Sequence, residues 1–213
     1  MYITHNNVVI NVQLSEQFTM KDCEKIIEMA KKGNGMVTAT DVSKAGLQRR
    51  ALAECVLAGT LSKGARGVYF LPDQFEDEFA IWQHTYPQGV FSGNTALYLL
   101  KKTDRIPYAL CMTFPKGYNA SAAKRNGLKC KIVVAERYNL GVQEVISPYG
   151  NRVRCYNIER TLCDIVGEND IQTTNQAFKE YVQSKDKDIP LLMSYAKILH
   201  VEKPVRNYME ILL

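Results

Sequence analysis

Apolar residues near the start of the chain recur at the spacing of an α-helix in two successive segments. The first spans residues 21–32, where isoleucine, methionine and alanine fall on one face. The second is shorter and runs through 41–45. Either Thr38 or Thr40 can cap its N-terminus, because a side-chain hydroxyl satisfies a free backbone N–H. Gly46 can then supply the left-handed turn that ends a helix. The pattern therefore predicts two consecutive helices with a tight turn after the second.

A third apolar stripe at helical spacing follows that turn, and a hairpin pattern follows the stripe. The helix is expected to begin at Gln48 and to end at Gly59. Residues 61–71 predict two short strands around a Gly-punctuated basic turn, and Pro72 ends the second strand. The apolar positions that we expect to face the core from the third helix are Leu47, Ala51, Leu52, Cys55, Val56 and Leu57.

Helix, short turn, helix and hairpin is the element order of a winged helix-turn-helix, whose second helix enters the major groove of DNA with its first turn against the bases. Gln48, Arg49 and Arg50 begin that helix here, and their planar side chains can donate paired hydrogen bonds to guanine or adenine. Lys63 and Arg66 fall at the tip of the hairpin, where they suit backbone phosphate or the minor groove. A small helical module with solvated charges is the alternative, and the pattern favours DNA binding. We expect the DNA-binding residues to be Lys44, Gln48, Arg49, Arg50, Lys63 and Arg66.

From Val90 onward the pattern mixes strands and helices. Strands are expected at 90–92, 109–114 and 130–135, and a hairpin of 142–146 with 153–156 is expected to turn at 148–151. Helices are expected at 95–102, 158–166, 174–182, 189–199 and 204–213, with a helical turn at 120–124.

These patterns divide the chain into three parts. Residues 1–18 carry almost no charge and form an N-terminal extension, either an extra strand or a tail. Residues 19–73 form the winged helix-turn-helix, and residues 74–213 form a C-terminal domain. The acidic run 73–78 can be a linker or the first turn of a helix, and the helix dipole favours the helix. The fold class expected is α+β: an N-terminal winged helix-turn-helix followed by a mixed α/β domain that ends in several helices.

Charge is distributed unevenly along the 213 residues, although the net charge is only +5. Residues 19–72 contain nine Lys and Arg against five Asp and Glu, and residues 91–160 contain twelve against four. The acidic stretch 73–90 lies between them. Two separate basic regions indicate a polyanionic partner that touches both.

The remaining composition points to a cytoplasmic protein without a metal site. The six cysteines fall inside apolar patterns, form no C-x-x-C pair and are accompanied by only three histidines. We therefore expect reduced, buried thiols. No apolar run approaches the ~20 residues of a membrane span, and the N-terminus lacks the features of a signal peptide. The cysteines are Cys23, Cys55, Cys111, Cys130, Cys155 and Cys163.

Motifs that would indicate an enzyme are missing. There is no G-x-S-x-G, no G-x-x-x-x-G-K-[ST] and no G-x-G-x-x-G after a strand. A nuclease would need clustered carboxylates for a divalent ion, and the acidic residues of the second half are scattered. Arg160 beside Glu159 is interpreted as a structural ion pair. We expect no catalytic activity, no cofactor and no catalytic residues.

A second basic cluster lies between residues 116 and 131 and is interleaved with Tyr118. It suits phosphate contact, either with operator DNA or with an RNA, and the alternative is a solvated loop that aids solubility. If it binds, its residues can also carry antitoxin activity. They are Lys116, Lys124, Arg125, Lys129 and Lys131.

Five short motifs together resemble the AbiEi family of antitoxins. Two lie in the third helix and its end, Gly46-Leu-Gln-Arg-Arg-Ala-Leu and Gly59-Thr-Leu, and a third is the hairpin run Ala65-Arg-Gly-Val-Tyr-Phe-Leu-Pro. The others are Val90-Phe-Ser-Gly-Asn-Thr-Ala-Leu and Ile158-Glu-Arg-Thr-Leu-Cys-Asp. Their order and spacing carry the resemblance from about residue 20 to the C-terminus. No family counterpart is identified for the residues before it.

The resemblance implies an antitoxin of a bacterial type IV, abortive-infection toxin–antitoxin system that acts in phage resistance. Its winged domain would repress the operon by binding inverted repeats in the promoter, with Gln48, Arg49 and Arg50 on the recognition helix and Lys63 and Arg66 on the wing. Its C-terminal domain would counter an AbiEii-like nucleotidyltransferase toxin without a stable complex. The alternative is an RNA- or protein-binding regulator that uses the basic C-terminal cluster, and a nuclease is a third hypothesis.

Overall fold

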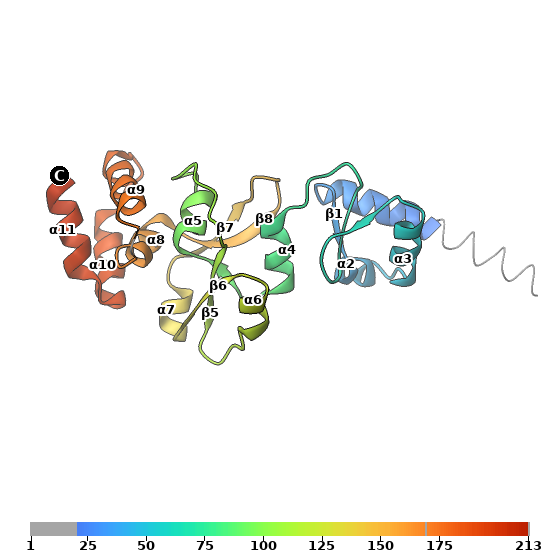
Figure 1. The fold of residues 1–213 in the computed structure, drawn as a ribbon, viewed down its shortest axis with the longest axis horizontal. Helices are drawn as coiled ribbons and strands as arrows, with labels where there is room; N and C mark the ends of the chain where they lie inside the picture. Colours follow the sequence, from blue (N-terminus) through green and yellow to red (C-terminus); the bar gives the residue numbers. More distant parts are fainter. Residues whose placement is uncertain (1–20, 169, 213) are drawn as a thin grey trace, which may run out of the picture. The chain divides into compact units, whose positions relative to one another are not determined.

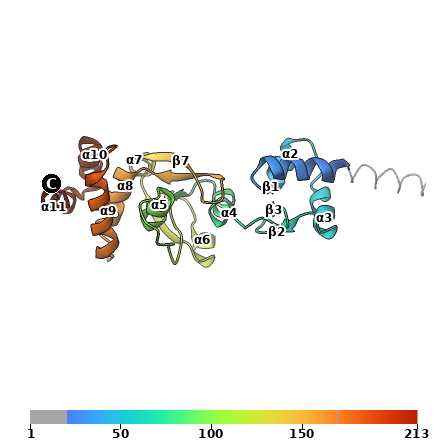
Figure 2. The ribbon, with the colours of Figure 1, turned by 90° about the horizontal axis from the view of Figure 1, so that it is seen from above.

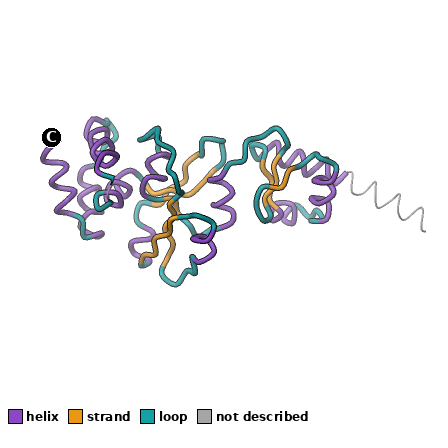
Figure 3. Tube along the Cα trace, viewed as in Figure 1, coloured by secondary structure: helices purple, strands orange, loops and turns teal. Residues whose placement is uncertain are grey.

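The computed structural model describes residues 21–168 and 170–212, and these residues form two compact units. The first unit extends to Thr85 and includes Tyr149–Asn151, and the second contains Tyr86–Pro148 and the chain from Arg152 onward. Each unit holds one β-sheet and several helices (Figure 1; Figure 3). The architecture is therefore mixed α/β, consistent with the expected α+β class. The N-terminal extension 1–18 lies outside the described residues.

The first unit opens with a helix over 21–32 and contains a three-stranded antiparallel sheet in the order β1-β3-β2. Strand β1 was not expected from the sequence, because its three residues are too few for a periodic signal. The elements after the first helix are β1 Met36–Thr38, α2 Ala39–Lys44, α3 Arg50–Leu57, β2 Ser62–Lys63, β3 Val68–Phe70 and α4 Glu78–Thr85.

Local chemistry fixes the start and the end of α2. Thr38 is its N-cap, and its hydroxyl accepts a hydrogen bond from the backbone N–H of Asp41 at 3.1 Å. The Asp41 carboxylate in turn accepts from the backbone N–H of Thr38, which completes a capping box. At the other end Gly46 has φ +74°, and the N–H of Leu47 donates to the carbonyl of Val42. This Schellman turn sets α3 close behind α2, as expected.

The predicted core face of α3 is correct except at one position. Ala51, Leu52 and Cys55 are buried, whereas Leu57 is 87% exposed, because it lies at the last position of the helix and outside the buried stripe. Helix α3 begins at Arg50, with Gln48 and Arg49 in the turn before it, so it starts two residues later than expected. The buried residues of this core are Ile26, Ala30, Val37, Val42, Ala51, Leu52, Cys55 and Leu61.

The first unit extends past residue 73, where the sequence suggests a boundary. Helix α4 belongs to it because Ile81 packs against Val68 and Phe70 of β3. Asp77 accepts a hydrogen bond from the N–H of Ala80 and so opens the helix. The acidic run 73–78 therefore leads into a helix, which is the alternative that the helix dipole favoured. That helix begins at Glu78, later than expected, and covers the sheet of the first unit. The division between the units falls after Thr85.

Two cysteines are not free thiols, which corrects the expectation of six reduced cysteines. Cys23 on the first helix and Cys55 on α3 form a disulfide with Cα atoms 5.9 Å apart. Both side chains contribute to the core between these helices. They are 32 positions apart in sequence, so only the packing of the two helices brings them together. Cys111, Cys130, Cys155 and Cys163 are free.

The second unit is built on a five-stranded sheet in the order β6-β5-β4-β8-β7. Strands β5 and β6 are parallel and are joined through α6, and β7 pairs with β8 as an antiparallel hairpin. All five strands fall where the sequence predicts strands, but the short helix α7 was not expected. The elements are β4 Val90–Phe91, α5 Gly93–Leu99, β5 Cys111–Pro115, α6 Ser121–Arg125, β6 Lys129–Val133, α7 Ala135–Asn139, β7 Val142–Ile146 and β8 Arg152–Tyr156.

Four helices complete the second unit and pack together around a separate core (Figure 1; Figure 2). Their apolar faces include Leu162, Phe178, Leu192 and Val205, all fully buried. None of the helices in the described part of the chain has the length and apolarity needed to cross a membrane. The helices are α8 Ile158–Ile165, α9 Ile171–Gln183, α10 Ile189–Leu199 and α11 Glu202–Leu212.

Candidate nucleic-acid interface

The three side chains expected on the recognition helix are all exposed at the start of α3. Gln48 and Arg49 lie in the turn before the helix and Arg50 is its first residue. The Nε of Arg49 donates a 2.7 Å hydrogen bond to the hydroxyl of Ser43 on α2. A guanidinium has five N–H donors, so this bond orients the side chain while its remaining donors stay available.

Arg50 is held by a second polar contact within α3. Its Nε lies 2.8 Å from Oε1 of Glu54, one helical turn later, and the Arg50 side chain remains 70% exposed. An exposed i, i+4 pair of this kind contributes only about 0.3–0.5 kcal/mol to stability. It therefore orients the guanidinium and leaves Arg50 free to exchange the carboxylate for another acceptor at little cost.

The hairpin of β2 and β3 presents the other two predicted cations. Ser62 pairs with Phe70 and Lys63 with Tyr69, which leaves residues 64–67 as the connecting turn. Lys63 and Arg66 are both exposed. The end of the turn is attached to α2, because the N–H of Ala39 donates to the carbonyl of Gly67 at 2.8 Å.

The base of the hairpin is attached to α3 through the carbonyl of Cys55, which accepts from the N–H groups of Thr60 and Leu61. Lys44 is exposed in the last turn of α2. All six predicted DNA-binding residues are thus solvent-accessible and belong to the first unit. Ser43 and Glu54, which orient the two arginines, were not singled out from the sequence, although the i, i+4 spacing of Arg50 and Glu54 is a recognisable signal.

The second basic cluster does not form one continuous patch. Lys124 and Arg125 are exposed in the last turn of α6. Lys131 on β6 is taken up by an ion pair, its Nζ lying 2.6 Å from Oε1 of Glu168. Lys129 lines a cavity of about 250 Å³ together with Arg105, which lies outside the cluster predicted from the sequence.

The strand register explains this separation. Lys129 and Lys131 alternate with Cys130 along β6, so their side chains leave the opposite face of the sheet from that of Cys130, whereas Lys124 is close to Cys130. Lys116 is exposed directly after β5. The five residues therefore do not act as a unit, and Lys131 is occupied within the protein.

The fold has a counterpart among solved structures. It is similar to the crystal structure of the RV2827C protein from Mycobacterium tuberculosis, with a TM-score of 0.54. The two chains share 12% sequence identity over 89% of this chain and 81% of the other, so the likeness concerns the fold. No protein-family model matches the chain, and no curated protein matches it.

The motif Ile158–Asp164 has a structural role that the sequence suggested only in part. Arg160 is 1% exposed, and its Nε lies 3.3 Å from Oδ1 of Asp164. The expected pair of Arg160 with Glu159 is wrong, because neighbouring residues on a helix do not face each other, whereas residues four apart do. Glu159 instead accepts a hydrogen bond from the hydroxyl of Tyr181.

Of the two acids in this motif, Glu159 and Asp164, it is Asp164 whose contacts offset the cost of burying a charge least. Burial raises the pKa of its carboxyl above the ordinary value, and the positive charges of Arg160 and Lys131 oppose that rise. Its Oδ2 atom is buried without a hydrogen-bond partner among the described residues. The described ranges 21–168 and 170–212 contain no group of three or more His, Cys, Asp or Glu side chains arranged to hold a metal ion.

Proposed function

We propose that this chain is an AbiEi-type antitoxin that represses its own operon through a winged helix-turn-helix in the first unit. The observation that carries the proposal is the exposure of Gln48, Arg49 and Arg50 at the start of α3, a helix that is followed in the chain by a basic hairpin. The element order helix, β1, α2, α3, β2, β3 matches the order expected of a winged helix. The second unit would then act against a nucleotidyltransferase toxin, as the family resemblance implies.

The contacts around α2 and α3 support this assignment. A recognition helix must present rigid donors, because each immobilised long side chain costs about 0.5–1.5 kcal/mol on binding. The hydrogen bond to Ser43 already orients Arg49, which lowers that cost for this side chain, whereas the exposed pair with Glu54 restrains Arg50 only weakly. The hairpin is attached to α2 and to α3 by backbone hydrogen bonds, so Lys63 and Arg66 keep a fixed position relative to the helix.

Replacing Arg49 or Arg50 by alanine tests the proposal. If either makes a bidentate contact with a base, its loss weakens binding to DNA from the chain's own promoter by about 1–3 kcal/mol and relaxes preference at one base position. Arg206→Ala is the matched control, because Arg206 is also exposed and also pairs with a glutamate four residues away, at 2.7 Å. Fluorescence anisotropy with promoter and scrambled duplexes measures the effect.

The salt dependence separates base contacts from phosphate contacts. Removal of Lys63 or Arg66 is expected to reduce the slope of log K against log salt by about 0.9 for each phosphate that is no longer neutralised, with similar effects on both duplexes. If the unmodified protein binds promoter and scrambled DNA with equal affinity, the proposed repressor role is contradicted. If Arg206→Ala lowers DNA affinity as much as Arg49→Ala or Arg50→Ala, the assignment of the interface to α3 is contradicted.

A further inference from the structure

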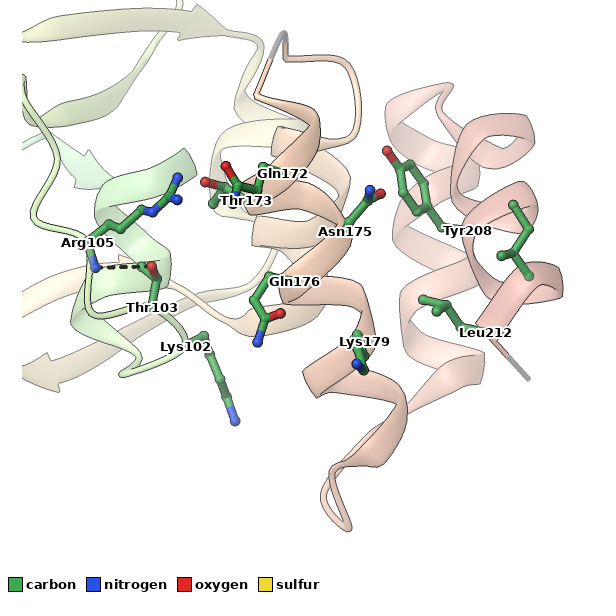
Figure 4. Close-up of a pocket in the computed structure, with 11 residues that line it drawn as sticks. Lys102, Thr103, Arg105, Gln172, Thr173, Asn175, Gln176, Lys179, Tyr208 and Leu212 are labelled. Carbon is green, nitrogen blue, oxygen red and sulfur yellow. Dashed lines mark hydrogen bonds between the residues drawn. The ribbon is translucent and has the colours of Figure 1, made fainter.

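The second unit contains a cationic pocket that no part of the proposed promoter contact uses. It has a volume of about 700 Å³ and lies over the exposed side of α9 (Figure 4). The segment after α5 borders it on one side and α11 on the other. Its basic residues are Lys102, Arg105 and Lys179, and none of the described residues that line it is acidic. A volume of this size is within the range of small-molecule sites.

The backbone fixes the two cations of the pocket that come from the segment after α5. Lys101 adopts φ +57°, and the N–H of Lys102 donates to the carbonyl of Leu97, so α5 ends in a Schellman turn. The N–H of Arg105 donates to the hydroxyl of Thr103 at 3.2 Å, which closes a small turn. Lys102 and Arg105 therefore project from an ordered segment.

Helix α9 supplies the floor of the pocket. Gln172, Asn175, Gln176 and Lys179 are exposed and line it, with the spacing of one helix face. Amide side chains on this face can donate and accept hydrogen bonds toward sugar hydroxyls and base edges. Gln176 already donates to Glu180 at 2.6 Å, which leaves its carbonyl oxygen as a free acceptor.

No described residue that lines the pocket is acidic, and Asp170 is the acid whose charge acts on Arg105. None of Lys102, Arg105 and Lys179 forms an ion pair with a residue in the described part of the chain. Asp170, close to Arg105, keeps its negative charge, and both its carboxylate oxygens accept from Thr173 as the cap of α9. Those hydrogen bonds, with a smaller contribution from Arg105, lower the pKa of the Asp170 carboxyl.

An apolar wall completes the pocket on the side of α11. Tyr208 lines it while its ring stacks on the buried Phe178, with centroids 4.6 Å apart. Ile211 is 81% exposed and Leu212 lies beside it in the lining. The pocket thus combines three cations, hydrogen-bonding amides and an apolar surface, which matches a ligand with phosphate, sugar and base.

We propose that this pocket binds a nucleotide, with the phosphates on Lys102, Arg105 and Lys179 and the base against the apolar wall of α11. The nucleotide can be free or can be one unit of an RNA strand, because both present the same chemistry to these residues. This site is independent of the promoter contact, since its residues all belong to the second unit.

Binding of fluorescently labelled ATP and of a labelled single-stranded RNA octamer tests the proposal. The variant Lys102→Ala/Arg105→Ala/Lys179→Ala is expected to bind at least tenfold more weakly than the unmodified protein. For the RNA, the slope of log K against log salt should fall by about 0.7 for each phosphate that the variant no longer neutralises. Lys203→Glu is the control: it removes a lysine from α11 outside the pocket, and an acid in the first turn of a helix is well tolerated.

The two probes separate the two sources of the nucleotide. Saturable ATP binding that the triple variant loses indicates a free nucleotide, and loss of RNA binding alone indicates a strand. Failure of the unmodified protein to bind either probe overturns the proposal, as does an equal loss in Lys203→Glu. Promoter affinity measured on the same variants should not change, so failure here is distinguishable from failure of the repressor assignment.

Discussion

At the scale of single residues, Arg160 and Asp164 show how a buried charge is accommodated in the second unit. The Arg160 guanidinium lies over the ring of Tyr156, 4.2 Å from its centroid, and donates to the backbone carbonyls of Arg137 and Leu140. These contacts replace water around the cation, which is the condition for burying it. Asp164 receives less compensation, because one of its oxygens has no partner among the described residues.

This imbalance predicts a pH-dependent effect of Asp164→Asn. The folded-state pKa of Asp164 lies above its ordinary value of 3.8, so the native protein holds this proton more tightly than the unfolded chain. Its contribution to stability is therefore complete below that ordinary value and is lost as the pH rises through the folded pKa. The asparagine at position 164 does not titrate. Between pH 3.8 and the folded pKa of Asp164, the free energy of unfolding of the variant should therefore rise relative to that of the unmodified protein. Above the folded pKa, the difference between the two proteins should stay constant.

Urea unfolding followed by circular dichroism across the acid range measures that difference. Asp104→Asn, which changes an exposed acid of the same unit, is measured alongside as the control. A relative gain of Asp164→Asn that shrinks with rising pH would contradict the direction of the shift.

At the scale of elements, the junction between β1 and α2 positions the proposed recognition helix. Thr38 is both the last residue of β1 and the N-cap of α2. Gly46 ends α2 at a position where an added Cβ would meet no atom within 4 Å. The sequence offered Thr38 and Thr40 as equal candidates for the cap. The structure selects Thr38, because its hydroxyl accepts the hydrogen bond from the N–H of Asp41, and Thr38 is held at the end of β1 by pairing with Val68.

Thr38→Val should therefore destabilise the first unit, whereas Thr40→Val should not. Valine keeps the β-branched shape but leaves the N–H of Asp41 without its acceptor, and the loss of such a cap costs about 0.5–2 kcal/mol. Thr40 is exposed, so its replacement should stay within about 0.5 kcal/mol. Trp82, the one tryptophan of the chain, lies on α4 and reports the unfolding of this unit by its fluorescence. Equal losses in the two variants would show that the capping box is not the cause.

At the scale of the whole molecule, the basic residues separate into two sets that belong to different compact units. Lys44, Arg49, Arg50, Lys63 and Arg66 lie in the first, and the cluster from Lys116 to Lys131 lies in the second. Each unit has its own sheet and its own buried core. Substitutions of exposed residues in one unit should therefore leave the other folded.

This division predicts that the two proposed activities, promoter binding and toxin neutralisation, can be lost separately. Lys124→Glu/Arg125→Glu, on the exposed last turn of α6, should abolish rescue from the co-expressed toxin while promoter affinity stays unchanged. Arg49→Ala/Arg50→Ala should show the reverse pattern. Growth assays and anisotropy on the same four proteins, with Arg206→Ala as control, decide between the outcomes. Loss of both activities in both variants would argue against independent units.

The sequence by itself determined the elements whose causes are local. The caps and glycine turns around α2 depend on residues a few positions apart, as do the strands of the second unit. These patterns can therefore be recognised in a single sequence. The length of the first unit and the disulfide between Cys23 and Cys55 were decided only by tertiary packing. The same holds for the pairing of Arg160 with Asp164 and for the pocket beside α9. In each case, which residues become neighbours is settled only when the elements pack. The periodicity of one segment predicts which of its faces is buried, but it does not predict which other segment that face contacts.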